Sequence, residues 1–179
     1  MNFLLNTKQK GFTIIELIVV IAIIAVLATI VLSSLQNYRI KADGTRMAQD
    51  LQAMEVALRL LKVEQKLDTW PRESTWAGSP PLVKNISGIS QFLSTTISPP
   101  ISGINYYYDN DGDTMVEGSC TCCSGVNIGL EVCPNCQQYF TTVDKIIDGG
   151  DGPCYGKVRS NGTSYSYLYY NLSTVETTN

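Results

Sequence analysis

All six cysteines of the chain lie in one short stretch, where their spacing allows two kinds of cross-link. Cys120-x-x-Cys123 and Cys133-Pro134-Asn135-Cys136 have the two-knuckle spacing of a structural four-cysteine zinc site. An even number of cysteines is also typical of a disulfide framework, which forms where exported thiols are oxidised. The set available for pairing is Cys120, Cys122, Cys123, Cys133, Cys136 and Cys154. The choice between zinc and disulfides therefore depends on the compartment.

A second group of residues able to do chemistry is an acidic turn just before the cysteines. Asp109, Asp111 and Asp113 alternate with Asn110 and Gly112, and Glu117 follows. Ca²⁺ takes six to eight hard oxygen ligands in irregular geometry, which a glycine-containing loop can supply. We therefore expect a calcium site, and the alternative is an acidic turn without an ion, because Asp, Asn and Gly are also plain turn formers.

A second acidic turn, Asp148-Gly149-Gly150-Asp151, is a weaker signal. We interpret it as a loop.

Composition argues against two classes of function. The chain contains no histidine, which removes histidine-based general acid–base chemistry, the Ser-His-Asp arrangement and most catalytic zinc sites. From Asp68 onward there are 5 basic and 11 acidic residues, so this part lacks the basic surface of a nucleic-acid-binding protein. We expect neither an enzyme nor nucleic-acid binding by the isolated C-terminal part.

An apolar run near the N-terminus gives the strongest signal in the chain. Residues 12–32 form 21 consecutive positions with a single charge, Glu16. A helix of this length spans about 30 Å, which matches the hydrocarbon core of a bilayer. The short segment before the run carries only Lys8 and Lys10 as charges, so the positive-inside tendency keeps it cytoplasmic and sends the rest of the chain outward. Export favours the disulfide interpretation of the cysteines.

The junction between this polar leader and the apolar run has a recognisable motif. Lys10-Gly11-Phe12-Thr13-Ile14-Ile15-Glu16-Leu17 strongly resembles the prepilin-peptidase recognition site of type IV pilins and type II secretion pseudopilins. The resemblance implies cleavage after Gly11, N-methylation of Phe12 and retention of the apolar segment. A residue without a Cβ also lets the backbone extend into a protease cleft. The alternative is an ordinary signal anchor or secretory signal peptide, but a secretory signal has its cleavage site after the apolar run.

Glu16 is the residue of the apolar run that needs an explanation, because a carboxylate in a membrane helix is costly. By resemblance to the family, it pairs with the N-terminal amine of a neighbouring subunit during assembly. In an apolar filament core either unpaired charge is expensive, so the pair favours one axial register. The alternative is a glutamate that extends to the membrane interface.

The helix is expected to continue beyond the membrane to about Leu67. Five apolar residues recur at spacings of four, three, four and three, which is one face of an α-helix, and we expect this face to pack on a sheet. Pro71 stops the helix because the residue before a proline is disfavoured in the α region. Ser33, Ser34 and Gly44 are positions where the helix could bend. The apolar face consists of Met47, Leu51, Met54, Leu58 and Leu61.

The remainder is expected to form a connecting loop and a small antiparallel sheet. Residues 69–104 are rich in Pro, Ser and Gly, with one short helix expected at 89–97. Short β-prone runs between turn residues predict four strands, at 104–108, 126–132, 139–143 and 164–172. Calcium in a β-loop also resembles the major pseudopilin of the family.

The sequence thus predicts an α+β pilin fold: a long N-terminal helix, half of it transmembrane, packed on a small antiparallel sheet. The expected parts are a cleaved leader (1–11), a transmembrane assembly helix (12–34), the amphipathic half of the same helix (35–68), the connecting loop (69–104) and the β-sheet head (105–179).

The expected function is that of a structural subunit of a type IV pilus or a type II secretion pseudopilus. The resemblance implies as partners the prepilin peptidase, the inner-membrane assembly platform, the membrane and other copies of the chain. The protein would first be a single-pass protein of the cytoplasmic membrane and then part of an extracytoplasmic filament. Two alternatives are a minor tip subunit acting as an adhesin and a membrane-anchored extracellular domain that never polymerises.

Overall fold

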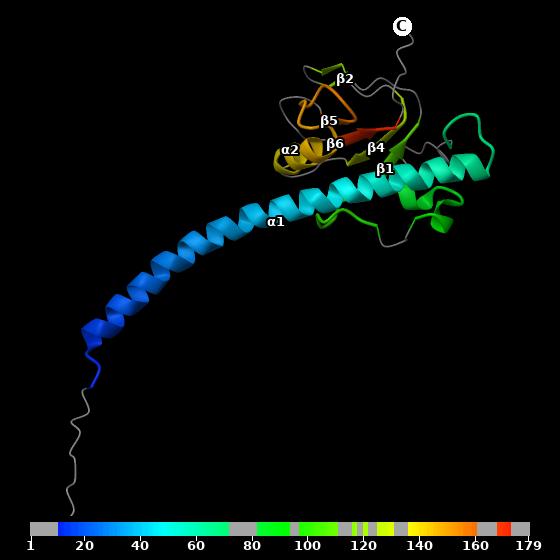
Figure 1. The fold of residues 1–179 in the computed structure, drawn as a ribbon. Coiled ribbons are helices and arrows are strands. Elements are labelled where there is room, and N and C mark those ends of the chain that lie inside the picture. The colour runs from blue at the N-terminus through cyan, green and yellow to red at the C-terminus, as the bar shows by residue number, and fades with distance from the viewer. Residues whose placement is uncertain are drawn as a thin grey trace, which may run out of the picture. The chain divides into compact units, whose positions relative to one another are not determined.

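The computed structural model describes residues 11–71, 82–93, 97–110, 116–117, 120–121, 125–130, 136–160 and 168–172. The chain divides into two compact units, Met1–Arg39 and Ile40–Asn179, which are described separately below. The first contains the apolar run and the second contains the sheet, and both contain part of the helix α1 (Figure 1).

Helix α1 runs from Ile14 to Glu64, and its C-terminal end has a specific stop signal. Lys66 lies in the left-handed region with a φ of 54°. Its N–H donates to Val63 O at 3.2 Å, and the Leu67 N–H donates to Lys62 O at 3.0 Å. This pair of bonds is a Schellman motif, which satisfies the last carbonyls of a helix. The helix therefore ends shortly before the predicted Leu67, and the motif rather than Pro71 ends it.

The apolar face predicted for the second half of α1 is buried, as expected. Its five residues are 0–2% exposed and lie in one core cluster with residues of the sheet and of α2. In Figure 1 the strands and α2 lie along this part of α1. Burying five large aliphatic side chains stabilises the head by about 1.5–3 kcal/mol for each, before the entropic cost of folding.

The head contains a four-stranded antiparallel sheet with the spatial order β1-β4-β6-β5. Tyr108, Ile128, Tyr170 and Val158 lie side by side across it, and all four are 0–1% exposed. A separate ladder pairs β2 with β3. The bounds are β1 Tyr107–Asp109, β2 Val116–Glu117, β3 Cys120–Thr121, β4 Asn127–Leu130, β5 Val158–Ser160 and β6 Leu168–Asn171. The predicted α+β class is confirmed.

One of the predicted strands is wrong. Residues 139–143 lie inside helix α2, Cys136–Ile147. Phe140, Val143 and Asp144 are buried and Ile147 packs against the core, which is the i, i+3, i+4, i+7 spacing of a helix face. The β-branched and aromatic residues in this stretch suggested a strand, but packing overrides local propensity.

Gly44 shows how closely α2 approaches α1. A Cβ built on Gly44 would lie 2.7 Å from the Cβ of Thr142, a distance that real side chains do not reach. The sequence suggested that Gly44 is a point where the helix bends, whereas the structure shows a close contact between two helices.

The connecting region contains two single 3₁₀ turns in place of the one short helix that was expected. They are η1, Val83–Asn85, and η2, Ile89–Gln91. Val83 and Ile89 are buried in the core.

A buried carboxylate network joins α1 to the sheet. Glu55 of α1 is 9% exposed. Its carboxylate accepts hydrogen bonds from Arg59 Nη2 at 2.7 Å, from Lys157 Nζ at 3.0 Å and from the Tyr170 hydroxyl. Burial alone would raise the pKa of Glu55, but these donors outweigh it and leave the pKa below its usual value of 4.5. Sequence reasoning missed the network, because its members are far apart in the chain.

Acidification is therefore expected to destabilise the head through Glu55. Folding lowers the pKa of Glu55 below its unfolded-state value of 4.5. The stabilisation that the Glu55 carboxylate contributes is therefore complete above pH 4.5 and is lost as the pH falls through the lower folded-state pKa. Melting curves of the full chain in detergent between about pH 7 and about pH 3 measure this loss. Glu55→Gln should melt lower at neutral pH and lose less on acidification, whereas Glu64→Gln, at an exposed position of the same helix, should follow the wild type. Equal pH slopes for Glu55→Gln and the wild type would contradict this assignment.

Candidate processing and assembly site

The first turn of α1 holds Glu16 by a reciprocal cap. Thr13 directly precedes the helix, and its backbone N–H and side-chain hydroxyl both donate to Glu16 Oε2, at 2.9 and 2.8 Å. The Glu16 N–H is 3.3 Å from Thr13 Oγ1. This is a capping box, in which Thr13 is the N-cap and Glu16 the third helical residue. The signal for this cap, Thr-x-x-Glu, is present in the sequence, although the sequence-based prediction assigned Glu16 to assembly alone.

The residues at the predicted cleavage point are open to solvent within this chain. Phe12 is 84% exposed, and a Cβ built on Gly11 would meet no atom within 4 Å. Nothing in the described part of the chain therefore requires glycine at position 11. A requirement for glycine would come from another protein that binds this segment.

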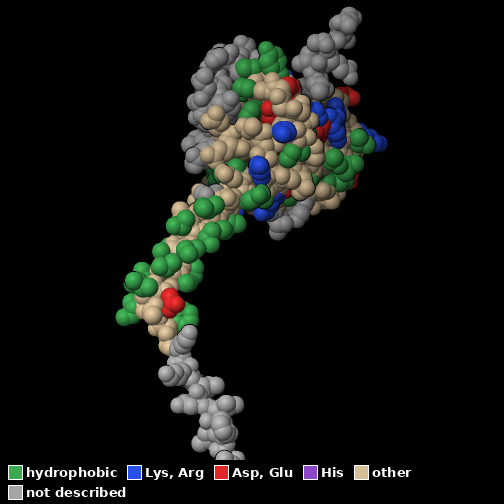
Figure 2. Space-filling model, turned by 60° about the vertical axis from the view of Figure 1, so that its left-hand side comes forward, with side chains coloured by type: hydrophobic (Ala, Val, Ile, Leu, Met, Phe, Trp, Pro, Cys, Tyr) green, Lys and Arg blue, Asp and Glu red, His purple; other side chains and the backbone are tan. Residues whose placement is uncertain are grey.

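The apolar run is uncovered along its whole length within one chain. Its large apolar side chains from Phe12 to Leu32 are between 47% and 84% exposed, and Figure 2 shows hydrophobic side chains gathered on this segment around a single acidic group. The helix is long and apolar enough to cross a membrane. An apolar surface of this extent needs lipid or other protein chains to cover it.

Of the four predicted calcium ligands, Asp109 is the one whose side chain lies in the described part of the chain, so the site stays a prediction. Asp109 closes β1, where it pairs with Asn127 of β4. Asp111 and Asp113 lie outside the described residues, and Glu117 is described only as a backbone position of β2.

The predicted zinc or disulfide cysteines are also largely outside the described part. Cys122, Cys123 and Cys133 are not described, and Cys120 and Cys136 are described only as backbone positions of β3 and α2. The geometry of the two cysteine knuckles therefore stays a prediction.

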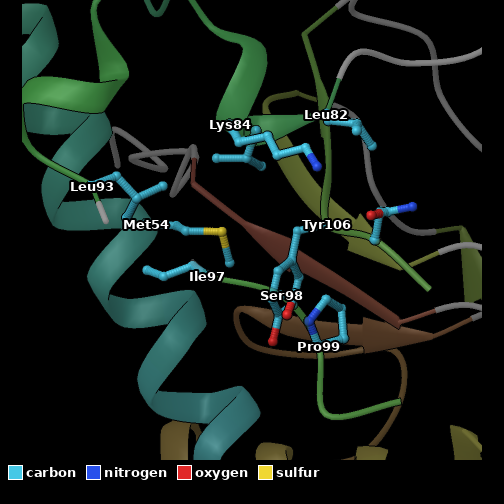
Figure 3. Close-up of a pocket in the computed structure, with 10 residues that line it drawn as sticks. Met54, Leu82, Lys84, Leu93, Ile97, Ser98, Pro99 and Tyr106 are labelled. Carbon is cyan, nitrogen blue, oxygen red and sulfur yellow. The ribbon is translucent and has the colours of Figure 1, made fainter. Parts of the chain in front are cut away.

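The head also contains a cavity of about 230 Å³, which the sequence did not suggest. Figure 3 shows it between α1 and the connecting region, with Met54, Leu93 and Ile97 pointing into it beside Tyr106 and Lys84. The Tyr106 hydroxyl donates to Asp50 Oδ2 at 3.1 Å. Of the ten lining residues Lys84 alone is charged.

Comparison with known proteins identifies the motif at the N-terminus. Residues 6–32 match the model of the prokaryotic N-terminal methylation motif. In this segment the chain is similar to type IV pilins and type II secretion pseudopilins. No solved structure matches the chain.

Relatives from both branches of this family are similar to the chain. The prepilin peptidase-dependent protein D of Escherichia coli is 42% identical over 84 residues, which are 46% of this chain and 58% of the relative. The type II secretion system core protein G of E. coli is 44% identical over 57 residues, 32% of this chain and 39% of the relative. The type IV major alpha-pilin of Moraxella bovis is 43% identical over 67 residues, 37% of this chain and 42% of the relative. The matches therefore span less than two thirds of these family members.

Proposed function

We propose that this chain is a structural subunit of a type IV pilus or a type II secretion pseudopilus. The observation that carries the proposal is the exposed apolar run of residues 12–32, whose single carboxylate, Glu16, lies in the first helical turn next to a processing motif. A helix of this kind fits the core of a filament, where the same surface on neighbouring copies replaces lipid. The motif matches relatives named as pilins and as a secretion-system core protein, which supports a structural rather than an enzymatic role.

Processing precedes assembly in this proposal. A prepilin peptidase removes residues 1–11, and Phe12 becomes the methylated N-terminus of the mature chain. An inner-membrane assembly platform then moves the subunit from the cytoplasmic membrane into the filament. There the Glu16 carboxylate pairs with the positively charged N-terminal amine of a neighbouring copy.

Filaments sheared from the cell surface test this function. We expect the chain to be the main component, with an intact mass that corresponds to residues 12–179 plus one methyl group. A few copies per filament would instead indicate the tip subunit or adhesin. A processed chain that stays in the membrane fraction would indicate a membrane-anchored domain that does not polymerise, and a mass that includes residues 1–11 would contradict the proposal.

We also propose that the acidic turn with Asp109, Asp111, Asp113 and Glu117 binds Ca²⁺. Its alternating carboxylates supply hard oxygen ligands in a glycine-containing turn. Equilibrium dialysis of full-length Asp111→Asn/Asp113→Asn tests this site, and calcium binding equal to that of the wild type would contradict it.

For the cysteines we propose disulfides rather than a zinc site. Cys154 is disulfide-bonded in the structure, which supports this interpretation, and the export expected of a pilin-like head supports it as well. We expect close to zero free thiols on the denatured, unreduced protein, no bound zinc, and a lower melting temperature in reductant, since each bridge contributes about 2–4 kcal/mol. Four free thiols with one zinc per chain would identify a Cys120, Cys123, Cys133 and Cys136 zinc site instead.

A further inference from the structure

Three aspartates meet at the C-terminal end of α2. Asp144 lies in the last turn of the helix, Asp148 directly follows it, and Asp151 lies in the next turn of the loop. One carboxylate oxygen of each lies within 4.8 Å of those of the other two. The loop can fold back on the helix because Gly149, Gly150 and Gly152 have φ values of 80°, 88° and 100°, which glycine adopts without strain.

Asp144 has a buried oxygen without a hydrogen-bond donor. The residue is 4% exposed, and its Oδ2 accepts the Gly152 N–H at 3.2 Å. Its Oδ1 is fully buried and has no hydrogen-bond partner among the described residues. A buried carboxylate oxygen without a partner is costly, so such an atom in a folded protein calls for a ligand or an ion.

Asp148 and Asp151 line a space that glycine keeps open. Asp148 Oδ2 accepts the backbone N–H groups of Lys157 and Val158 at 2.8 and 2.6 Å, which fixes this carboxylate in place. A Cβ built on Gly156 would lie 2.6 Å from Asp148 Oδ2 and 2.7 Å from Asp151 Oδ2. Any other residue at position 156 would displace both carboxylates.

The negative charges of the cluster are not balanced within the described residues. The ion pairs of the described part involve Asp50 and Glu55 and none of these three aspartates. Three carboxylates this close repel one another unless a cation lies among them.

We propose that Asp144, Asp148 and Asp151 bind a divalent cation of the calcium class. The donors are hard oxygens from a helix end and a glycine-containing loop, which suits the irregular coordination of Ca²⁺. Mg²⁺ demands near-ideal octahedral geometry, and Zn²⁺ prefers nitrogen or sulfur donors, so both fit this oxygen set less well. The Asp144 Oδ1 gains its missing partner, and the ion ties the end of α2 to the loop that enters β5. This site is separate from the acidic turn at residues 109–117.

Calcium binding to the full-length protein in detergent tests the site. After removal of metal with a chelator, equilibrium dialysis counts the calcium bound per chain, and melting curves with and without millimolar CaCl₂ report its effect on stability. The wild type is expected to melt several degrees higher with calcium, since a ligand that binds only the folded state stabilises it. An equal concentration of MgCl₂ should shift the melt less.

One double variant at the cluster, a control at an exposed aspartate elsewhere and a variant of the acidic turn localise the ion. Asp144→Asn/Asp151→Asn should lose one calcium equivalent per chain, whereas Asp68→Asn, at an exposed position elsewhere, should lose none. Asp111→Asn/Asp113→Asn should keep the equivalent that the cluster variant loses. If the acidic-turn variant removes all calcium binding, or the cluster variant removes none, the proposal is overturned. A wild type that binds no calcium at millimolar concentration overturns it as well.

Asp151→Asn alone separates metal binding from folding, because Asp151 is exposed. We expect its affinity for calcium to fall at least tenfold, while its melting temperature without metal equals or exceeds that of the wild type, since one of three like charges is gone. If the metal-free variant melts lower and its calcium affinity is unchanged, Asp151 is a structural residue of the loop and the site is wrong.

Discussion

Replacing Gly11 with valine is expected to leave the leader of residues 1–11 on nearly all of the protein. A β-branched side chain at this position obstructs the extended backbone that a protease cleft needs. The described residues give no reason for any other effect, because a Cβ at Gly11 meets none of their atoms within 4 Å. Uncleaved subunits keep the leader ahead of Phe12, so the free amine that would pair with Glu16 is never formed and filaments should be absent.

Intact mass spectrometry of the membrane fraction measures this result directly. Gln9→Val is the matched control, since it introduces the same side chain into the leader two residues before the cleavage point and leaves Lys8 and Lys10 in place. We expect the control to be trimmed and the Gly11→Val chain to retain residues 1–11. Normal trimming of Gly11→Val would show that the motif is not used as a peptidase site.

Replacing Glu16 with alanine is expected to lower the amount of filament at least tenfold without affecting trimming. Removal of a charge makes the span more apolar, so membrane insertion is not impaired. In the filament, the neighbour's amine is left without its partner in an apolar core, and breaking a buried pair from one side costs about 3–5 kcal/mol. Because each 1.4 kcal/mol is about tenfold in an equilibrium constant, loss of the pair alone is sufficient for this effect.

The capping box offers a competing explanation for Glu16, and two variants separate it from charge pairing. Glu16→Gln keeps an oxygen that can accept the Thr13 N–H, so a role in capping alone predicts normal assembly. Thr13→Ala removes the N-cap side chain and keeps the charge, at a cost of about 0.5–2 kcal/mol to the helix. If the charge is what assembly needs, Glu16→Gln should fail almost as badly as Glu16→Ala, and Thr13→Ala should assemble.

Yields of sheared filaments at equal subunit expression report these outcomes, with the intact mass confirming that each variant is trimmed. Normal filament amounts from both Glu16 variants would show that the carboxylate has no role in assembly. Failure of Glu16→Ala with full assembly of Glu16→Gln would assign the residue to the cap. In the described chain Glu16 Oε2 already accepts two hydrogen bonds from Thr13, so the carboxylate is held at the start of the helix before any second subunit binds.

The N-terminal part of this protein could be predicted from the sequence because its signals are local. The apolar run, the short basic leader and the Gly-Phe motif are each complete within a few consecutive residues, and they led to the family that the methylation-motif match supports. The buried face of α1 was also predictable, since its 3.6-residue period is a property of one helix. Short β-prone runs between turn residues likewise predicted strands where β4 and β6 lie.

Tertiary contacts decided the features that the sequence did not reveal. Residues 139–143 have the composition of a strand, but a helix places Phe140 and Val143 together in the core. Glu55 is a typical polar residue of a helix until Lys157 and Tyr170 reach it from the sheet, 102 and 115 positions away along the chain. Asp144 gave no signal, and the turn from Asp148 to Asp151 suggested only a loop. These groups come together only when α2 and the loop before β5 fold against each other. Patterns along the chain report local structure, so they do not reveal which residues of different elements come into contact.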